Sequence, residues 1–299
     1  MIRNRKVFFI LCTLLSIGAF ASDVKFSWPI QTSALENKLT SLFGESRGDH
    51  FHNGVDISSD NEEIRPIDQG QILFSRFDSD NPFRNGMGSG NCVWIGHSKG
   101  FLSGYFHLKD GREDGLLKKV QVNKTDVIGR SGNTGHSMGS HLHFILAKDG
   151  GKKIINPLPF LPVIPDTSAP KIGMMILTNV DKFTYVNDGD NINVSRAFPV
   201  SIPILDSGIR PGQRRGIQRV KFLLNGKVLK DAGFNEISLR ENTWVNETGQ
   251  SFEELFFLGN YFVGNLSFVS GENVLEVRTS DFSGNEAAKV IGFNVTRIK

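Results

Sequence analysis

Short apolar and alternating runs, separated by clusters of glycine, asparagine and aspartate, make up most of residues 60–150. Such runs predict β-strands joined by turns, because β-branched and aromatic side chains suit a pleated sheet and Gly, Asn and Asp suit tight turns. The predicted strands are 71–74, 93–95, 103–108 and 141–146. A Gly-, Asn- and Asp-rich stretch over 78–91 predicts a long surface loop, and Ser33 is a candidate N-cap for one helix over 33–43.

The second half of the chain has the same strand-and-turn character. Val200, Ile202 and Ile204 alternate, and the prolines at 199 and 203 predict that this strand lies at the edge of a sheet. Asn225-Gly226 follows an apolar run and predicts a two-residue hairpin turn. An alternating run over 273–278, a turn over 281–285 and a last strand over 289–295 complete the pattern. Regularly spaced strands of this kind are typical of an immunoglobulin-like β-sandwich.

Two proline-bearing segments divide the chain near residue 165. Asn156–Pro162 ends the first half, and Asp166–Pro170 is expected to be a linker, because proline cannot join regular helices or sheet ladders. The expected fold class is mainly β. We expect an export segment at 1–21, an antiparallel β-sheet domain at 22–165 and an immunoglobulin-like β-sandwich at 166–299.

The export segment changes how the composition is interpreted. Three basic residues precede an apolar run from Val7 to Leu15, and Ala19-Phe20-Ala21 has the small-x-small pattern of a signal-peptide cleavage site. An uncleaved membrane anchor is the alternative, but the run is short for a membrane span, so stable membrane insertion is not expected. Without those three basic residues the chain has 31 basic and 31 acidic residues, which gives no argument for nucleic-acid binding. Only Cys92 then remains, in a predicted buried strand.

All seven histidines lie between residues 50 and 143, so metal chemistry is expected in the first half only. In a strand, His141 and His143 would point to one face about 7 Å apart. Extended chain would hold His52 and Asp56 about 13 Å apart, so they can share a metal only if the chain bends, and Asn53-Gly54 favours a bend. His52, Asp56 and one strand histidine would then leave a fourth position for water, as a catalytic zinc site requires.

Each of these motifs alone is weak, because a His-x-His pair is often just strand surface and His-x-x-x-Asp is weaker still. In combination they resemble a known family over residues 40–162. The matching segments are Phe51–Ile57, Pro66–Gly70, Tyr105–Leu108, Ile128–Gly135 and Ser140–Phe144. They occur in the order and at the spacing of the lysostaphin-like zinc endopeptidases, also called the LytM or M23 peptidase family.

The resemblance implies one zinc ion per chain held by His52, Asp56 and His143, with His107 and His141 as the catalytic histidines. It implies hydrolysis of peptide bonds in bacterial peptidoglycan through a zinc-activated water. The partners expected are peptidoglycan peptides and a wall or protein ligand of the C-terminal domain. The location expected is the periplasm, the cell envelope or the extracellular medium.

The alternatives are a non-catalytic relative that binds the wall or activates an amidase, and a zinc peptidase that acts on a non-wall protein. Three places depart from the usual family pattern and bear on substrate fit: Ile145 stands where an acidic residue is frequent, Gly139-Ser140 where Gly-Pro is frequent, and Phe106 where a small residue is usual. His97 is expected to be structural. Arg47 either positions substrate or pairs with Asp49.

Overall fold

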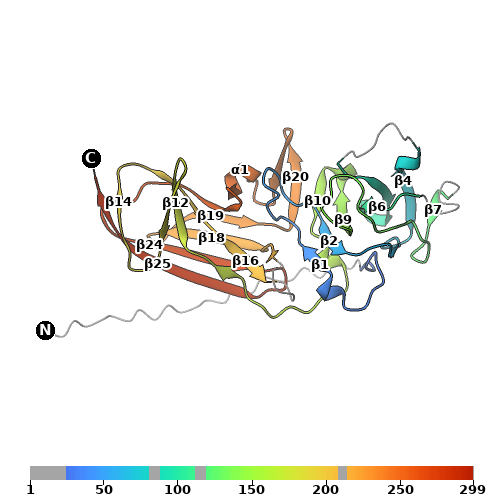
Figure 1. Cartoon of the computed structure of the whole chain (residues 1–299), viewed down its shortest axis with the longest axis horizontal. Coiled ribbons are helices and arrows are strands. Elements are labelled where there is room, and N and C mark those ends of the chain that lie inside the picture. Colours follow the sequence, from blue (N-terminus) through green and yellow to red (C-terminus); the bar gives the residue numbers. More distant parts are fainter. Residues whose placement is uncertain (1–24, 81–87, 112–118, 208–213, 299) are drawn as a thin grey trace.

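The computed structural model describes residues 25–80, 88–111, 119–207 and 214–298. It is mostly antiparallel β, and Figure 1 shows an N-terminal half in blue to green beside a C-terminal half in yellow to red. Among these residues no helix is long and apolar enough to cross a membrane. The predicted export segment and its cleavage site lie outside the described residues.

One large sheet forms the N-terminal half, with strand order β10-β9-β6-β5-β4-β7 and with β1 and β2 joined to it through β9. Its strands are β1 (Leu39–Ser41), β2 (Val55–Ser58), β4 (Gly70–Arg76), β5 (Asn91–Gly96), β6 (Leu102–Leu108), β7 (Gln121–Val122), β9 (His141–Lys148) and β10 (Lys153–Ile155). β3 (Glu63–Ile64) and β8 (Gly129–Arg130) pair separately. The four strands predicted in this half are confirmed as β4, β5, β6 and β9. Cys92 is buried in β5, as predicted.

The predicted helix over 33–43 is wrong. The structure has only a 3-10 turn, η1 (Leu35–Asn37), preceded by Ala34 in the left-handed region with φ 56°. The chain then enters β1, where Leu39 pairs with Ile57 and Ser41 with Asp56. Pairing with β2 therefore overrides a local helical pattern that has no side-chain cap. This correction matters because β1 lies directly beside the strand that carries Asp56.

Two five-stranded sheets form the C-terminal half, in the orders β13-β12-β15-β23-β22 and β14-β25-β24-β18-β19. Inward-facing side chains of both sheets belong to one buried cluster, for example Val200 and Ile202 from the first sheet and Val277 and Ile291 from the second. The strands are β12 (Met175–Asn179), β13 (Lys182–Val186), β14 (Asn191–Val194), β15 (Phe198–Ile202), β18 (Arg219–Leu224), β19 (Lys227–Gly233), β22 (Phe256–Phe257), β23 (Asn260–Leu266), β24 (Gly271–Ser280) and β25 (Glu286–Arg297). Three shorter strands, β11 (Lys171–Ile172), β16 (Ile204–Ser207) and β17 (Arg214–Arg215), form a small separate sheet, and the helix α1 (Phe252–Leu255) precedes β22.

The hairpin predicted at Asn225-Gly226 is confirmed, since both residues have positive φ and join β18 to β19. The edge position predicted for the run at 200–204 is wrong, because β15 lies between β12 and β23. β12 pairs only with Val200 and Ser201 of β15. Pro199 lies outside this paired stretch, so its missing amide hydrogen removes no hydrogen bond to β12. Pro203 separates β15 from β16, which belongs to a different sheet.

The two halves share a sheet. A hairpin of the C-terminal half, β20 (Glu236–Arg240) and β21 (Thr243–Asn246), extends the N-terminal sheet through pairing of β20 with β10. Phe51 makes edge-to-face contacts with Phe252 and Phe256, with ring centroids 5.4 and 6.1 Å apart. Phe43, Phe51 and Ile154 belong to the same buried cluster as the sandwich core. The division near residue 165 stays a prediction, but the packing on its two sides is continuous.

Candidate metal centre

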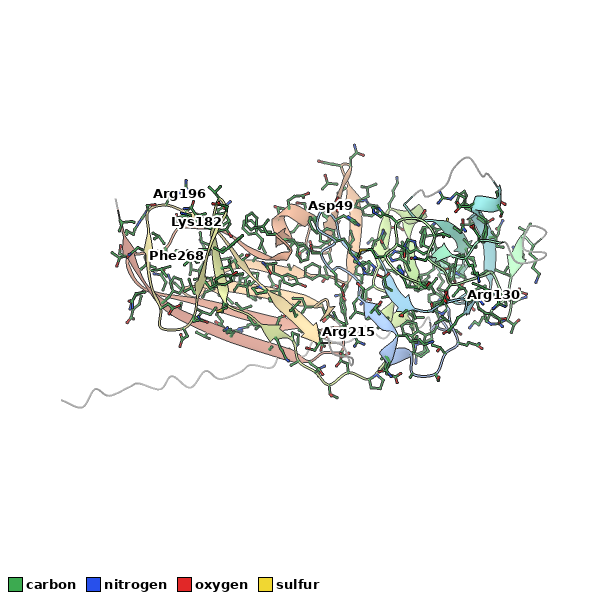
Figure 2. All side chains as sticks on the ribbon, viewed as in Figure 1. Asp49, Arg130, Lys182, Arg196, Arg215 and Phe268 are labelled. Carbon is green, nitrogen blue, oxygen red and sulfur yellow. The ribbon has the colours of Figure 1, made fainter. Side chains whose placement is uncertain are left out.

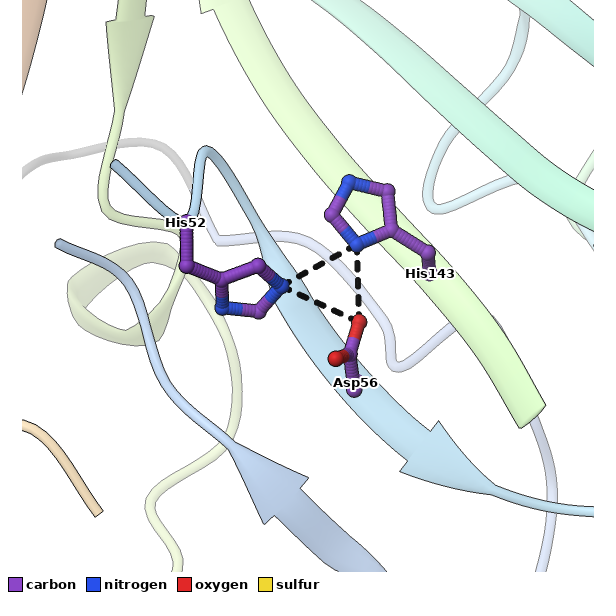
Figure 3. Close-up of side chains that lie close together, drawn as sticks. All are labelled: His52, Asp56 and His143. Carbon is purple, nitrogen blue, oxygen red and sulfur yellow. Dashed lines mark hydrogen bonds and ion pairs between the residues drawn. The ribbon is translucent and has the colours of Figure 1, made fainter. Parts of the chain in front are cut away.

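Three potential metal ligands meet where β2 and β9 pair in the N-terminal sheet. His52 Nε2 lies 3.1 Å from Asp56 Oδ1 and 3.1 Å from His143 Nδ1, and His143 Nδ1 lies 2.7 Å from the same Asp56 oxygen. Figure 3 shows the three side chains pointing toward one another from β2, from the segment before it and from β9. His52 and Asp56 are buried, at 4% and 7% exposure. Residues from the early part and the late part of the N-terminal half thus contribute to one small cluster.

Strand pairing and one glycine bring these side chains together. β2 pairs antiparallel with β9, with Asp56 directly opposite His143. His52 lies before β2, and the intervening Gly54 passes so close to β9 that an added Cβ would meet the Phe144 carbonyl oxygen at 2.4 Å and the His143 ring at 3.0 Å. The bend predicted at Asn53-Gly54 is present, since the His52 and Asp56 side chains meet. Gly54 is required there because of this close approach.

The hydrogen bonds fix which nitrogen of each imidazole faces the cluster. His52 Nδ1 donates to the Leu42 carbonyl over 2.6 Å, which leaves the Nε2 lone pair toward Asp56. His143 Nε2 donates to Asn53 Oδ1 over 3.0 Å, which leaves Nδ1 toward the same point. Two imidazole lone pairs and a carboxylate oxygen facing one another repel unless a cation lies between them. Two nitrogens and one oxygen suit zinc, so the donor set fits the metal that the sequence implies.

Asp56 is held in its ionised form. Burial on its own would raise the pKa of this carboxyl group, but the interactions with the neighbouring His52 and His143 hold the pKa well below its ordinary value. Arg47 adds a hydrogen bond from Nη2 to Asp56 Oδ2 over 2.5 Å, and the same nitrogen donates to Ser41 Oγ. Asp49, which was an expected partner of Arg47, contacts His50 instead. Arg47 therefore fixes the second oxygen of Asp56 and leaves the first for a metal.

Two more histidines stand beside the cluster. The His107 and His141 ring centroids are 4.8 Å apart, and His141 Nε2 lies 3.7 Å from Asp56 Oδ1. His107 Nδ1 donates to the Thr134 carbonyl over 2.8 Å, and His141 Nδ1 donates to the Gly139 carbonyl over 2.7 Å. Both rings therefore present a free Nε2 lone pair, and both are oriented by the loop that connects β8 to β9.

His107 has two further unusual features. It is a buried non-glycine residue with φ 59°, a conformation that side chains seldom adopt and that often marks functional sites. Burial lowers the pKa of His107 to about 4, against the opposing hydrogen bond to Thr134. The imidazole is therefore neutral near pH 7 and can accept a proton through Nε2.

All five residues expected at the site lie close together in the structure. The geometry also distinguishes His141 from His143 as the third ligand. His143 lies at the cluster, and His141 lies beside it. His97 is outside the site, with one ring nitrogen bonded to the Gln69 carbonyl and the other to Ser103 Oγ, in agreement with its expected structural role. The roles of the five residues remain predictions.

The sequence reasoning missed the residues that orient the ligands. Asn53 was considered only for the bend, although its side chain holds the His143 ring. Ser41 contacts both His52 and Arg47, and Glu45 bonds to Ser41 and to the Leu42 amide. Asn53 could have been found from its place inside the His52–Asp56 motif. Ser41 and Glu45 carry no local signal, because their roles depend on the pairing of β1 with β2.

An antiparallel β domain in which two histidines and an aspartate form one cluster, with two more histidines alongside, defines a metallopeptidase-like domain. Residues 50–157 match the model of Peptidase family M23. A second family model matches residues 169–296. The resemblance inferred from sequence is thereby confirmed.

Curated relatives match only part of this chain. An uncharacterized metalloprotease of Buchnera aphidicola is 35% identical over 109 residues, covering 36% of this chain and 25% of the relative. The murein hydrolase activator NlpD of Salmonella dublin is 32% identical over 138 residues, covering 45% of this chain and 31% of the relative. The chain thus spans about a quarter to a third of these relatives. A zinc-containing peptidase from Vibrio cholerae has 23% identity and a TM-score of 0.36, with 47% of this chain and 41% of that chain covered.

Two of the three departures from the family pattern have a structural explanation. Ile145 and Phe106 are 5% and 6% exposed, and both belong to the buried cluster that the N-terminal half shares with the C-terminal half. Phe106 also contacts Trp94 edge-to-face and lies 5.6 Å from the His143 ring. Both residues are therefore explained by packing across the junction, without reference to substrate.

Proposed function

We propose that the protein is an exported zinc endopeptidase that hydrolyses peptide bonds in bacterial peptidoglycan. The observation that carries the proposal is the convergence of His52, Asp56 and His143, each with its free ligand atom directed at one point. One such cluster of three ligands holds one zinc ion per chain. The relatives named for murein hydrolase activation support a wall-related role, and the apolar segment at 7–15 supports export.

The chain's own residues supply the rest of the chemistry. Zinc, when bound, lowers the pKa of water and polarises a carbonyl group. The His107 and His141 rings lie next to each other beside the cluster, where one Nε2 can take a proton from attacking water and the other, once protonated, can donate to developing negative charge on the carbonyl oxygen. Arg47 and Asn53 keep Asp56 and His143 in the orientation that ligation needs.

The experiment measures zinc content and the release of soluble fragments from purified peptidoglycan, with and without chelator. We expect about one zinc per chain and fragment release that the chelator abolishes. His143→Ala should lose both zinc and activity, with a fall of about 10³-fold or more in rate. His50→Ala is the matched control, because His50 is exposed and pairs with Asp49 instead of the ligands. Wall hydrolysis by His143→Ala at the wild-type rate would contradict the proposal.

A second candidate function is activation of another wall hydrolase, which the 32% identity to an activator favours. An activator needs no turnover of its own. In that case purified protein would leave peptidoglycan intact, with or without zinc, and would increase fragment release by an added amidase. A third candidate, cleavage of a non-wall protein, predicts zinc and chelator-sensitive cleavage of protein substrates alone. Mass spectra of the released fragments identify the bond if the first proposal holds.

A further inference from the structure

A second cluster of possible ligands, which shares no residue with the histidine cluster, lies where the linker meets the C-terminal half. Carboxylate oxygens of Asp166, Asp206 and Asp281 lie within 4.8 Å of one another. Asp166 belongs to the linker, Asp206 to β16 and Asp281 to the turn after β24. Arg215 lies opposite Asp206 in the neighbouring strand β17, and Figure 2 shows it at the boundary between the two halves.

These carboxylates are withdrawn from water. Asp206 and Asp281 are each 1% exposed, and the side chain of Asp166 is 9% exposed. Within the described part of the chain, Asp206 Oδ1 is buried without a hydrogen-bond partner. Asp281, by contrast, accepts hydrogen bonds from the amides of Ser283 and Asn285. Buried carboxylates are normally fully paired, so the free oxygen of Asp206 requires an explanation.

Arg215 does not supply the missing partner. Its Nη1 contacts Asp166 Oδ2 at 3.3 Å and its Nη2 donates to the Glu36 carbonyl, while its Nε is also buried without a partner in the described residues. One guanidinium group facing three carboxylates leaves two negative charges without compensation. Burial and the neighbouring Asp166 and Asp281 raise the pKa of Asp206 to about 7. The cluster thus lacks positive charge at one particular oxygen.

We propose that Asp166, Asp206 and Asp281 form a calcium site that joins the linker to the base of the C-terminal half. All available ligand atoms are oxygens, which suits a hard cation and does not suit zinc. Calcium–oxygen bonds are about 2.4 Å long, so ligands on opposite sides of one ion lie about 4.8 Å apart, and the three carboxylate oxygens lie within that distance of one another. Water completes the coordination that three carboxylates leave open.

Calcium there would connect three segments that are distant in sequence. Asn285, which follows Asp281 in the same turn, already donates to the Asp166 backbone carbonyl, and Arg215 reaches the Glu36 carbonyl in the N-terminal half. An ion on the three carboxylates would add a link between these contacts. It would hold the linker against the sandwich and so fix the two halves relative to each other.

The test is calcium titration of the whole metal-stripped protein by calorimetry, followed by thermal unfolding. We expect one calcium per chain, and a melting temperature about 5 °C higher at a calcium concentration of roughly 100 times Kd. Asp206→Asn should lose both effects. Asp181→Asn, an exposed aspartate in the turn between β12 and β13, should keep both. Absence of calcium binding by wild type at millimolar concentration would overturn the proposal.

Two further variants keep the outcome clear. Asp166→Asn alters a linker residue outside the sandwich sheets, so it reports on binding even if Asp206→Asn does not fold, and it should weaken calcium binding at least tenfold. His143→Ala should bind calcium as wild type does, because the two clusters share no residue. If Asp206→Asn instead melts higher than wild type and wild type ignores calcium, Arg215 and a proton neutralise the cluster, and the calcium site is wrong.

Discussion

Asp56 and Asp206 are buried aspartates that belong to two different possible metal clusters. The groups around them shift the pKa of the carboxyl group in opposite directions. Asp56 faces two imidazoles and an arginine, and its pKa lies well below the ordinary value. Asp206 faces two other carboxylates, and its pKa is raised to about 7. Burial opposes ionisation in both places. The nearby charges decide the outcome, so burial of a carboxylate does not by itself say what the cluster will bind.

The two clusters also differ in what surrounds the ligands. Around Asp56, each ligand has a partner that orients it, and two further histidines present free nitrogens. Around Asp206 there is no comparable proton acceptor among the described residues, and the three carboxylates come from a linker, a strand end and a turn. The first cluster is arranged for a reaction, whereas the second is arranged to join segments.

The largest effect is expected from removing a reaction partner while keeping the ligands. His107→Ala should retain zinc and lose about 10²- to 10⁴-fold in rate, because proton transfer is lost without loss of the metal. Zinc content and fragment release on the same sample measure the two quantities. The matched control is His136→Ala, an exposed histidine in the same neighbourhood. Loss of zinc in His107→Ala would show that His107 acts on the ligands instead of the reaction.

The next effect tests whether the two halves depend on each other. Phe252→Ala removes the ring that packs on Phe51 and should cost about 3 to 5 kcal/mol of unfolding free energy. Because Phe51 immediately precedes His52, zinc affinity should fall as well. Denaturant unfolding and zinc titration measure both, with Val228→Ala as control, since Val228 is 46% exposed. Separate unfolding of two independent units would argue against a shared core.

A smaller effect tests the role of Arg47. Arg47→Met should lower zinc affinity about 10- to 100-fold, because Asp56 loses the group that fixes its second oxygen. Competition with a zinc-binding dye measures the change. Lys119→Met is the control, since Lys119 forms only an exposed ion pair with Asp126. An equal loss in both variants would mean that overall charge, rather than the position of Arg47, sets the affinity.

The smallest effect concerns His97, a partly buried histidine outside both clusters. Burial lowers the pKa of His97 below its ordinary value, so the unfolded chain binds more protons than the folded one in the range between the two values. Stability therefore falls as pH decreases through that range. Wild type should lose more stability than His97→Gln between pH 7 and 5, measured by urea unfolding. Equal losses would show that His97 titrates alike in both states.

The features that could be predicted from the sequence are those that depend on residues close together along the chain. The spacing of His141 and His143 and the turn at Asn53-Gly54 are local features, and strand geometry translates them directly into positions. The strands at 71–74 and 141–146 and the hairpin at Asn225-Gly226 follow from local periodicity and turn chemistry in the same way.

What the sequence did not predict depends on contacts between distant segments. Residues 33–43 carry a helical pattern that pairing with β2 overrides. The prolines at 199 and 203 suggested an edge, but β12 pairs with β15 only at Val200 and Ser201, between the two prolines. The meeting of Asp166, Asp206 and Asp281 has no signal at all in the local sequence. Neither does the addition of β20 to the sheet of the first half, which only the folded chain reveals.

Because β10 pairs with β20, the two halves of this molecule are held together by more than the covalent linker between them. A protease that cuts the exposed linker near Thr167 and Ser168 would produce two fragments whose backbones still share a hydrogen-bonded ladder and a buried aromatic cluster. Such a nicked chain would elute as one particle. The C-terminal half is therefore not an independent domain that can be exchanged between proteins, because its β20–β21 hairpin forms part of the sheet of the N-terminal half.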